Sequence, residues 1–198
     1  MQATPTPKKL KPTERQTLAQ AVLTRYDAFF TTLGFFLVGV RAEYQAEALT
    51  LVFDIDKSDK NSPEGISLDD CYGATEKLLD AIEQDAELAL LDFQVEVGSP
   101  GLFRELKTPR ELTFYVGSPV KITVKKQTNS ATKKQKGLKK PQPITGILSA
   151  YDDATQRIII AADAPSAEAN CNAGIAVNLE PGTLVTLNPV IRKLQPIE

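Results

Sequence analysis

The apolar positions of the first third of the chain recur first at helical and then at strand spacing. Apolar residues recur at intervals of three and four after a capping box of Thr13 and Gln16. The pattern ends at Gly34, and together these features predict an amphipathic helix. The apolar residues of this pattern are Leu18, Val22, Tyr26, Phe29 and Leu33. The segments 35–43 and 49–55 are typical of strands, and the short link between them predicts a hairpin.

A second helix and a third strand follow. Ser67 and Asp70 form another capping box, and Asp70 lies in the first turn, where the helix dipole favours negative charge. Segment 88–97 then returns as a strand. Two helices can cover one face of three strands, so we predict an N-terminal α/β domain over residues 13–107 with the order α-β-β-α-β. The expected core face of the second helix comprises Leu68, Cys71, Thr75, Leu78, Leu79 and Ile82.

The rest of the chain contains short apolar runs separated by turn residues. This spacing predicts a small C-terminal β-barrel over residues 119–198, and the fold class is therefore α+β. Residues 108–118 are expected to link the two domains, with Thr108 capping a short helix and Pro109 at its first position. The barrel strands are predicted at 120–124, 144–151, 157–161, 173–179 and 183–187.

Charge divides the chain in the same way. Residues 1–97 hold 9 Lys/Arg and 17 Asp/Glu, whereas residues 98–198 hold 14 Lys/Arg and 8 Asp/Glu. An acidic half joined to a basic half indicates two domains with different tasks.

The change of sign falls at the turn Ser99-Pro100-Gly101, which follows the predicted third strand. Proline fixes φ near −65° and glycine tolerates positive φ, so we expect a rigid turn that requires Gly101. Arg104 follows, and its guanidinium can bind either a carboxylate between the domains or a phosphate outside. We favour the carboxylate, because Arg104 faces an acidic domain.

Composition argues against enzyme chemistry. The chain has no histidine, and its two cysteines, Cys71 and Cys171, are too far apart in sequence for a zinc knuckle or a redox pair. Asp54, Asp56 and Asp59 lack the glycine and terminal glutamate of a calcium loop, and we interpret them as a solvated strand end. We therefore expect no catalytic residues, no metal and no cofactor.

The sequence carries no membrane signal. No window approaches about 18 apolar residues, and the N-terminus has no hydrophobic region, so we expect neither a transmembrane helix nor a signal peptide. Residues 1–12 contain three prolines and three lysines and are expected to be a disordered tail. The alternative is a basic arm that touches nucleic acid.

A lysine-rich loop at 125–143 interrupts the predicted barrel. No acidic residue occurs between Glu111 and Asp152. The loop is either a solvated hairpin tip or a surface that follows nucleic-acid phosphates, since lysine neutralises phosphate without fixed geometry. The lysines that would contact such phosphates are Lys125, Lys126, Lys133, Lys134, Lys136, Lys139 and Lys140.

Two segments resemble the RimP-type ribosome maturation factors. The segment 95–106 is similar to the family signature, in which a strand is followed by Ser-Ser-Pro-Gly-Leu-Asp-Arg-Pro-Leu. The segment 65–71 resembles the motif that precedes the second helix of the family. Gly98, Phe103 and Glu105 depart from the usual Ser, Asp and Pro. The signature positions that match are Ser99, Pro100, Gly101, Leu102 and Arg104.

The resemblance implies a non-enzymatic, cytoplasmic protein that binds the small (30S) ribosomal subunit during maturation. It implies an SH3-like C-terminal barrel and a motif at the domain junction. The implied partners are 16S rRNA and a small-subunit ribosomal protein near the decoding centre, and we expect a monomer without a membrane partner. The alternative is a general RNA-binding or adaptor module of β-barrel type that is not specific to the ribosome.

Overall fold

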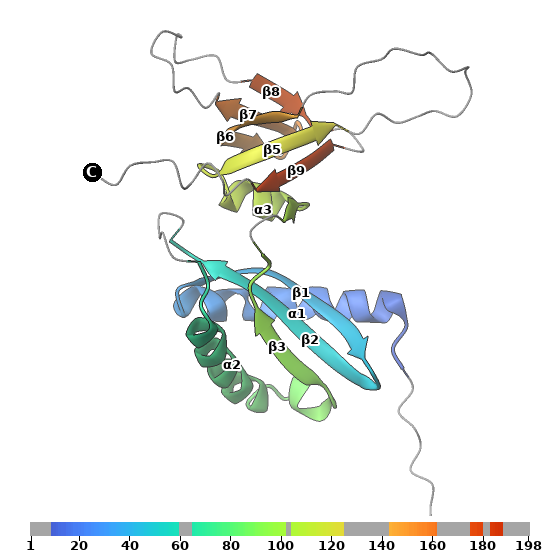
Figure 1. Cartoon of the computed structure of the whole chain (residues 1–198). Helices are drawn as coiled ribbons and strands as arrows, with labels where there is room; N and C mark the ends of the chain where they lie inside the picture. Colours follow the sequence, from blue (N-terminus) through green and yellow to red (C-terminus); the bar gives the residue numbers. More distant parts are fainter. Residues whose placement is uncertain are drawn as a thin grey trace, which may run out of the picture. The chain divides into compact units, whose positions relative to one another are not determined.

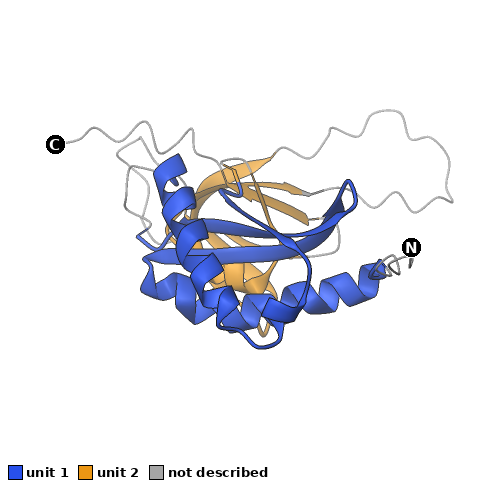
Figure 2. Cartoon of the chain, turned by 90° about the horizontal axis from the view of Figure 1, so that it is seen from below, with its two compact units in different colours: residues 1–100 blue, residues 101–198 orange. Residues whose placement is uncertain are grey.

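The computed structural model describes residues 9–59, 65–101, 104–124, 143–161, 175–179 and 183–187. The chain forms two compact units, Met1–Pro100 and Gly101–Glu198, which Figure 2 shows in blue and orange. Both contain helix and strand, so the fold class is α+β as predicted. Within the described residues, no helix is long and apolar enough to cross a membrane.

The first unit has the predicted order of helices and strands (Figure 1). Its sheet has the order β1-β2-β3, with β1 and β2 antiparallel and β2 and β3 parallel. The predicted hairpin is confirmed, because β1 and β2 are joined at Ala46 and Glu47. The elements are α1 (Pro12–Thr32), β1 (Phe35–Gln45), β2 (Ala48–Lys57), α2 (Leu68–Glu83), the 3₁₀ turn η1 (Leu88–Leu90) and β3 (Gln94–Gly98).

The core of this unit lies on one face of β2. Leu51, Phe53 and Ile55 alternate along β2 and are fully buried, as the period of two requires. Both helices contribute to this core. Tyr26 of α1 meets Phe53 edge-to-face with ring centroids 6.4 Å apart. The fully or nearly buried helix positions are Ala19, Val22, Tyr26 and Phe30 on α1, and Ala74, Leu78 and Ile82 on α2.

The start of α1 differs from the prediction, which made Thr13 the N-cap. The helix begins at Pro12, whose fixed φ suits the first helical position, and Lys11 precedes it. The Glu14 carboxylate accepts a hydrogen bond from the Lys11 backbone N–H at 2.6 Å. The predicted end at Gly34 is confirmed, since Gly34 follows the helix with φ +82°.

Helix α2 starts as predicted but buries a narrower face than expected. Ser67 Oγ accepts from the Asp70 N–H at 3.1 Å, and Asp70 accepts from the Ser67 N–H at 2.8 Å. Leu68 and Leu79 were expected in the core, yet 88% and 44% of their surface is exposed. Cys71, expected in the core, is half-buried.

The predicted strand 88–97 is partly wrong. Its first residues form η1, because Asp85 Oδ1 accepts from the backbone N–H groups of Glu87 and Leu88 and thereby starts a turn. The strand itself, β3, covers Gln94–Gly98.

The second unit is a six-stranded antiparallel sheet with a short helix. Its strand order is β4-β9-β5-β6-β7-β8, and the five predicted strands are confirmed. Within the described residues no pairing joins β4 to β8, so the sheet is not a closed barrel. The elements are β4 (Glu105–Leu106), α3 (Pro109–Phe114), β5 (Pro119–Val124), β6 (Ile144–Asp152), β7 (Arg157–Ala161), β8 (Ile175–Asn178) and β9 (Thr183–Leu187).

The core of this unit joins the strands to α3. Val120, Leu148, Ile158 and Ile160 are fully buried. The residues predicted to be a linker, 108–118, contain α3, and Thr108 caps it by accepting from the Glu111 N–H at 3.2 Å. The side chains of α3 and its end that enter the second core are Leu112 and Tyr115.

Candidate functional site

The motif turn follows β3 directly. Gly101 adopts φ +86°, which confirms that this position requires a conformation disfavoured by a Cβ. No atom lies within 4 Å of the place where a Cβ would be, so the requirement is one of backbone conformation and not of space. Leu102 lies outside the described residues, as does Phe103.

Arg104 places its guanidinium against Glu111 and Tyr115, both within the second unit. Its Nη2 lies 2.8 Å from Glu111 Oε1, and both side chains are only 10% exposed. Its Cζ lies 4.9 Å from the centre of the Tyr115 ring, which is cation–π distance. The carboxylate that the sequence left open is therefore Glu111, which belongs to the second unit and not to the acidic first unit.

Glu111 has two functions at this place. Its Oε2 accepts from the backbone N–H groups of Lys107 and Thr108, at 2.9 and 2.8 Å, and from the Thr108 hydroxyl at 3.0 Å. Its other oxygen faces Arg104. One carboxylate thus caps α3 and neutralises the arginine that follows the motif turn.

The Arg104 guanidinium is not saturated by these contacts. Nε and Nη2 are buried and make no hydrogen bond within the described part of the chain, although Nη2 lies 2.8 Å from Glu111 Oε1. The backbone carbonyl of Arg104 accepts from the Leu187 N–H at 3.1 Å, which ties this residue to β9. Arg104 is therefore a structural residue of the second unit.

The second motif segment is fixed by a similar pair in the first unit. Lys57 Nζ lies 2.7 Å from Asp70 Oδ1 and 5.5 Å from the centre of the Phe35 ring. The hydrogen bond from Lys57, together with those from Ser67, lowers the pKa of Asp70 to about 2. The acidic residue at the start of α2 thus serves as a cap and as the partner of a strand lysine, and not as a catalytic group.

A third charged cluster joins α1 to the turn before η1. Arg25 contacts Asp85 at 2.8 Å and also pairs with Glu87. Hydrogen bonding, first from the Leu88 backbone N–H, lowers the pKa of Asp85 to about 2. Burial, with the nearby Asp85, raises the pKa of the Tyr26 phenol to about 12.

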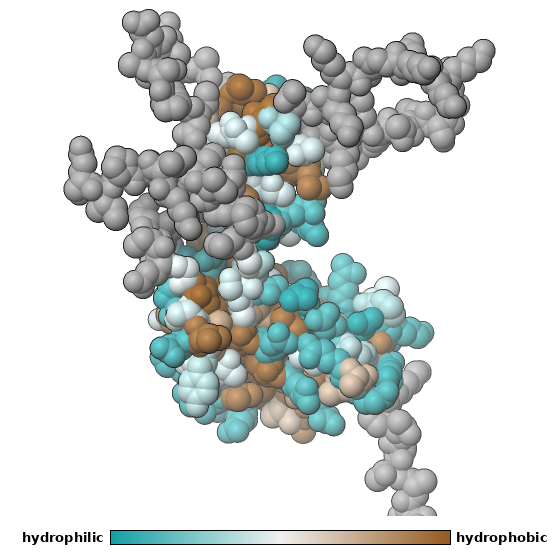
Figure 3. Space-filling model, viewed as in Figure 1, coloured by the Kyte–Doolittle hydropathy of each residue, from teal (hydrophilic) through white to brown (hydrophobic). Residues whose placement is uncertain are grey.

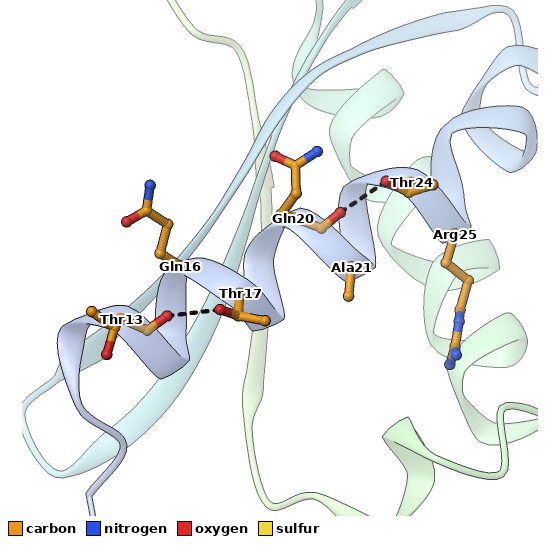
Figure 4. A pocket seen from close by; sticks show the side chains of 7 residues that line it. All are labelled: Thr13, Gln16, Thr17, Gln20, Ala21, Thr24 and Arg25. Atoms are coloured by element: carbon orange, nitrogen blue, oxygen red, sulfur yellow. Dashed lines mark hydrogen bonds between the residues drawn. The ribbon is translucent and has the colours of Figure 1, made fainter.

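One hollow among the described residues lies along the outer face of α1 (Figure 4). The hydroxyls of Thr17 and Thr24 bond to the carbonyls of Thr13 and Gln20, each at 3.0 Å. These hydroxyls are occupied by the backbone of their own helix, and the hollow contains no pair of groups suited to acid–base chemistry. It is lined by Thr13, Gln16, Thr17, Gln20, Ala21, Thr24 and Arg25.

The aspartates considered as a metal site have other contacts. Asp54 accepts from Arg41 Nε and Nη2, at 3.2 and 3.3 Å. The described residues contain no group of three or more Cys, Asp or Glu side chains that could hold a metal ion. Burial raises the pKa of the Cys71 thiol, which disfavours the reactive thiolate.

The structure separates the candidate residues into two groups. Ser99, Pro100, Gly101 and Arg104 are described, whereas the lysines 125, 126, 133, 134, 136, 139 and 140 lie outside the described residues. Sequence reasoning missed Glu111 and Tyr115 as partners of Arg104. The spacing Thr108-x-x-Glu111 is a capping box and was a usable signal for Glu111.

Comparison with known proteins gives a similarity to a ribosome maturation factor. No family model matches the chain. Over 96 residues it is 30% identical to a protein from Synechococcus sp. (strain CC9902), described as ribosome maturation factor RimP. The matched region is 48% of this chain and 59% of the relative, so the relationship is distant and partial.

Proposed function

We propose that this chain is a RimP-type ribosome maturation factor, a non-enzymatic protein that binds the small (30S) ribosomal subunit and assists its maturation. The observation that carries the proposal is the 30% identity over 96 residues to a protein described as ribosome maturation factor RimP. A distant relative of this kind suggests a role in ribosome assembly. The narrower statement about the 30S subunit is our inference.

The structural context of the two motif segments supports the proposal. One segment ends β3 and passes through Gly101 to Arg104, and the other starts α2 with the Ser67–Asp70 capping box. Both segments occupy turns at the ends of regular elements. Their polar groups are used for capping and ion pairing, which fits a binding protein better than an enzyme.

We also propose that the second unit is an SH3-like barrel. Its six strands form one antiparallel sheet with alternating burial along β7, as in a sheet that curls around a core. At Gly146 of β6 a Cβ would lie 2.4 Å from the Ala161 carbonyl oxygen, so glycine allows the close approach typical of a barrel corner. Closure of the barrel is the part of this proposal that rests on family resemblance.

The proposed mechanism is thermodynamic. A factor that binds a correctly folded subunit better than a misfolded one shifts the population toward the folded form, without any chemical step. The basic second half, with 14 Lys/Arg against 8 Asp/Glu over residues 98–198, is suited to rRNA phosphates. We propose 16S rRNA and a small-subunit ribosomal protein near the decoding centre as partners of a cytoplasmic monomer.

The test is sedimentation of the purified full-length protein with ribosomal particles. We expect it to sediment with free small subunits and not with mature 70S ribosomes. The alternative, a general RNA-binding or adaptor module, predicts binding to unrelated structured RNA with similar affinity. Equal binding to 30S, 70S and a control RNA would therefore contradict the proposed function.

A further inference from the structure

The first unit exposes apolar side chains that its own core does not use. Leu68 and Tyr72 lie on one side of α2, and Leu90 follows in η1, with 88%, 67% and 85% of their surface exposed. Leu90 lies beyond the other end of α2 from Leu68. The exposed Leu79 and Leu91 are found on that side, and large exposed apolar groups beside a groove indicate an interaction site. Figure 3 shows brown, apolar side chains gathered over α2 and the region beside it.

Near the end of α2 lies a groove between α2, η1 and β3, with a volume of about 260 Å³. Its walls are mainly apolar, and Leu79 and Leu91 on its rim are 44% and 45% exposed. It is therefore open to a partner side chain. The residues that shape it include Leu79, Ile82, Glu83, Leu91, Phe93 and Val95.

One wall of the groove is the edge of a sheet. Within the described residues β3 pairs only with β2, so its other edge is free for hydrogen bonding. Phe93, just before β3, and Val95 within it are two positions apart and contribute to the groove. An extended segment that added to β3 would point every second side chain toward α2.

The charge around the groove is strongly negative. Residues 65–98 contain nine Asp/Glu and one Lys. Asp70 is paired with Lys57, and Asp85 and Glu87 are paired with Arg25. Glu83 in the groove wall and Asp92 beside Leu91 make no ion pair within the described residues, so they are available to a cationic partner.

We propose that this groove binds an extended, cationic segment of another protein, in which Lys or Arg alternates with apolar residues. The apolar residues would enter the groove beside Leu79 and Leu91, and the basic residues would face Glu83 and Asp92. The inference concerns the first unit and does not rest on the proposed function, since either can fail while the other holds.

The test uses the full-length protein and a fluorescein-labelled peptide of four Lys alternating with Leu and Val, followed by fluorescence anisotropy. One control peptide has Glu in place of Lys, and another has Thr in place of Leu and Val. We expect both controls to bind at least about tenfold more weakly, because each lacks one of the two complementary features. Equal binding of the Thr peptide would overturn the apolar role of the groove.

Substitutions in the protein locate the site. Leu91→Ser should weaken binding of the Lys/Leu/Val peptide by about tenfold, whereas Ile175→Ser, at a residue that is 46% exposed in the second unit, should leave it unchanged. Glu83→Gln should weaken binding several-fold at low salt and less at high salt, with Glu105→Gln as the equal change of charge in the other unit. Unchanged circular dichroism melting checks the fold of each variant. Binding that is absent, or unaffected by Leu91→Ser and Glu83→Gln, would refute the proposal.

Discussion

At the scale of single residues, Arg104 explains how the segment after the motif turn is held. Its guanidinium forms an ion pair with Glu111 and lies over the Tyr115 ring. Its backbone carbonyl accepts a hydrogen bond from Leu187 of β9. A guanidinium can do all of this because it combines a delocalised charge with a flat, weakly hydrated surface. Lysine would retain the charge and lose the stacking.

Replacing Arg104 with Met should destabilise the second unit by on the order of 3 kcal/mol, because it leaves the buried Glu111 carboxylate without its cation. The measurement is urea unfolding of the full-length protein. The matched control is Lys107→Met, whose exposed pair with Glu105 at 3.7 Å should contribute little.

A double-mutant cycle measures the interaction between Arg104 and Glu111 separately from the other contacts of each residue. Glu111→Gln keeps an oxygen for capping α3 and removes the charge. If Arg104 and Glu111 stabilise each other, the double variant should lose clearly less free energy of unfolding than the two single variants lose together. Strict additivity would show that Arg104 acts through Tyr115 and not through Glu111.

Gly101 is the second residue whose substitution has a predictable effect on stability. Its φ of +86° disfavours any L side chain, although the surrounding space is open. Gly101→Val should therefore lower the free energy of unfolding by about 1–3 kcal/mol. Gly98→Val is the matched control, since Gly98 has ordinary φ and also nothing within 4 Å of its Cβ position. An equal effect of the two substitutions in urea unfolding would contradict the conformational explanation.

At the scale of elements, sequence reasoning succeeded where the determinants are local. The capping box of α2, the Thr108 cap of α3 and the glycine after α1 involve residues a few positions apart, so their pattern is visible in the sequence. Leu68 and Leu79 show that helical spacing alone does not predict which side chains are buried. Their helical spacing places them with core residues, but burial depends on which elements pack against α2, and that is a tertiary property.

The capping of α2 predicts how stability depends on pH. The pKa of Asp70 is lowered to about 2 by Lys57 and Ser67, from an unfolded value near 3.9. A lowered folded pKa stabilises the protein above the unfolded pKa, and this contribution is lost as pH falls through the folded pKa. Asp70→Asn should therefore destabilise the protein at pH 7, and the difference from wild type should shrink between about pH 4 and pH 2.

The measurement is the free energy of unfolding at several pH values for wild type and Asp70→Asn. Asp69→Asn is the control, because Asp69 also lies in the first turn of α2 and makes no ion pair within the described residues. At pH 7, Asp69→Asn should lower the free energy of unfolding by less than Asp70→Asn does. A wild-type advantage over Asp70→Asn that is unchanged down to pH 2 would contradict the role of the Lys57–Asp70 pair.

At the scale of the whole molecule, the order of elements was predictable and the assignment of short connections was not. Strand β4 has only two residues, Glu105 and Leu106, and no periodicity can reveal so short a strand. It exists because β9, about 80 residues later in sequence, pairs with it. The same long-range pairing brings Arg104 into the second unit, so the candidate site could be read from the sequence only as a motif and not as a set of contacts.

This pairing makes a prediction about fragments. We expect residues 1–100 to fold cooperatively alone, and a fragment of residues 13–107 to melt no higher, because residues 105–106, which only the second fragment contains, have no β9 to pair with. Thermal melting followed by circular dichroism makes the comparison. A higher and sharper transition for 13–107 would show that residues 101–107 stabilise the first unit, as a domain boundary at Lys107 requires. A broad melt for both fragments would show that the two halves share one folding unit.

The last prediction concerns how the whole molecule binds its proposed partner. If the seven lysines of the loop 125–143 contact rRNA phosphates, they act by counterion release, so affinity for free small subunits should fall steeply with salt. Replacing all seven with Gln should flatten that dependence by roughly 0.7 in logarithmic slope for each single-stranded phosphate that the variant no longer neutralises. Stability should stay within about 0.5 kcal/mol, as for other surface changes. Superimposable salt curves for the two proteins would exclude the loop as a phosphate-binding surface and assign subunit binding to other parts of the chain.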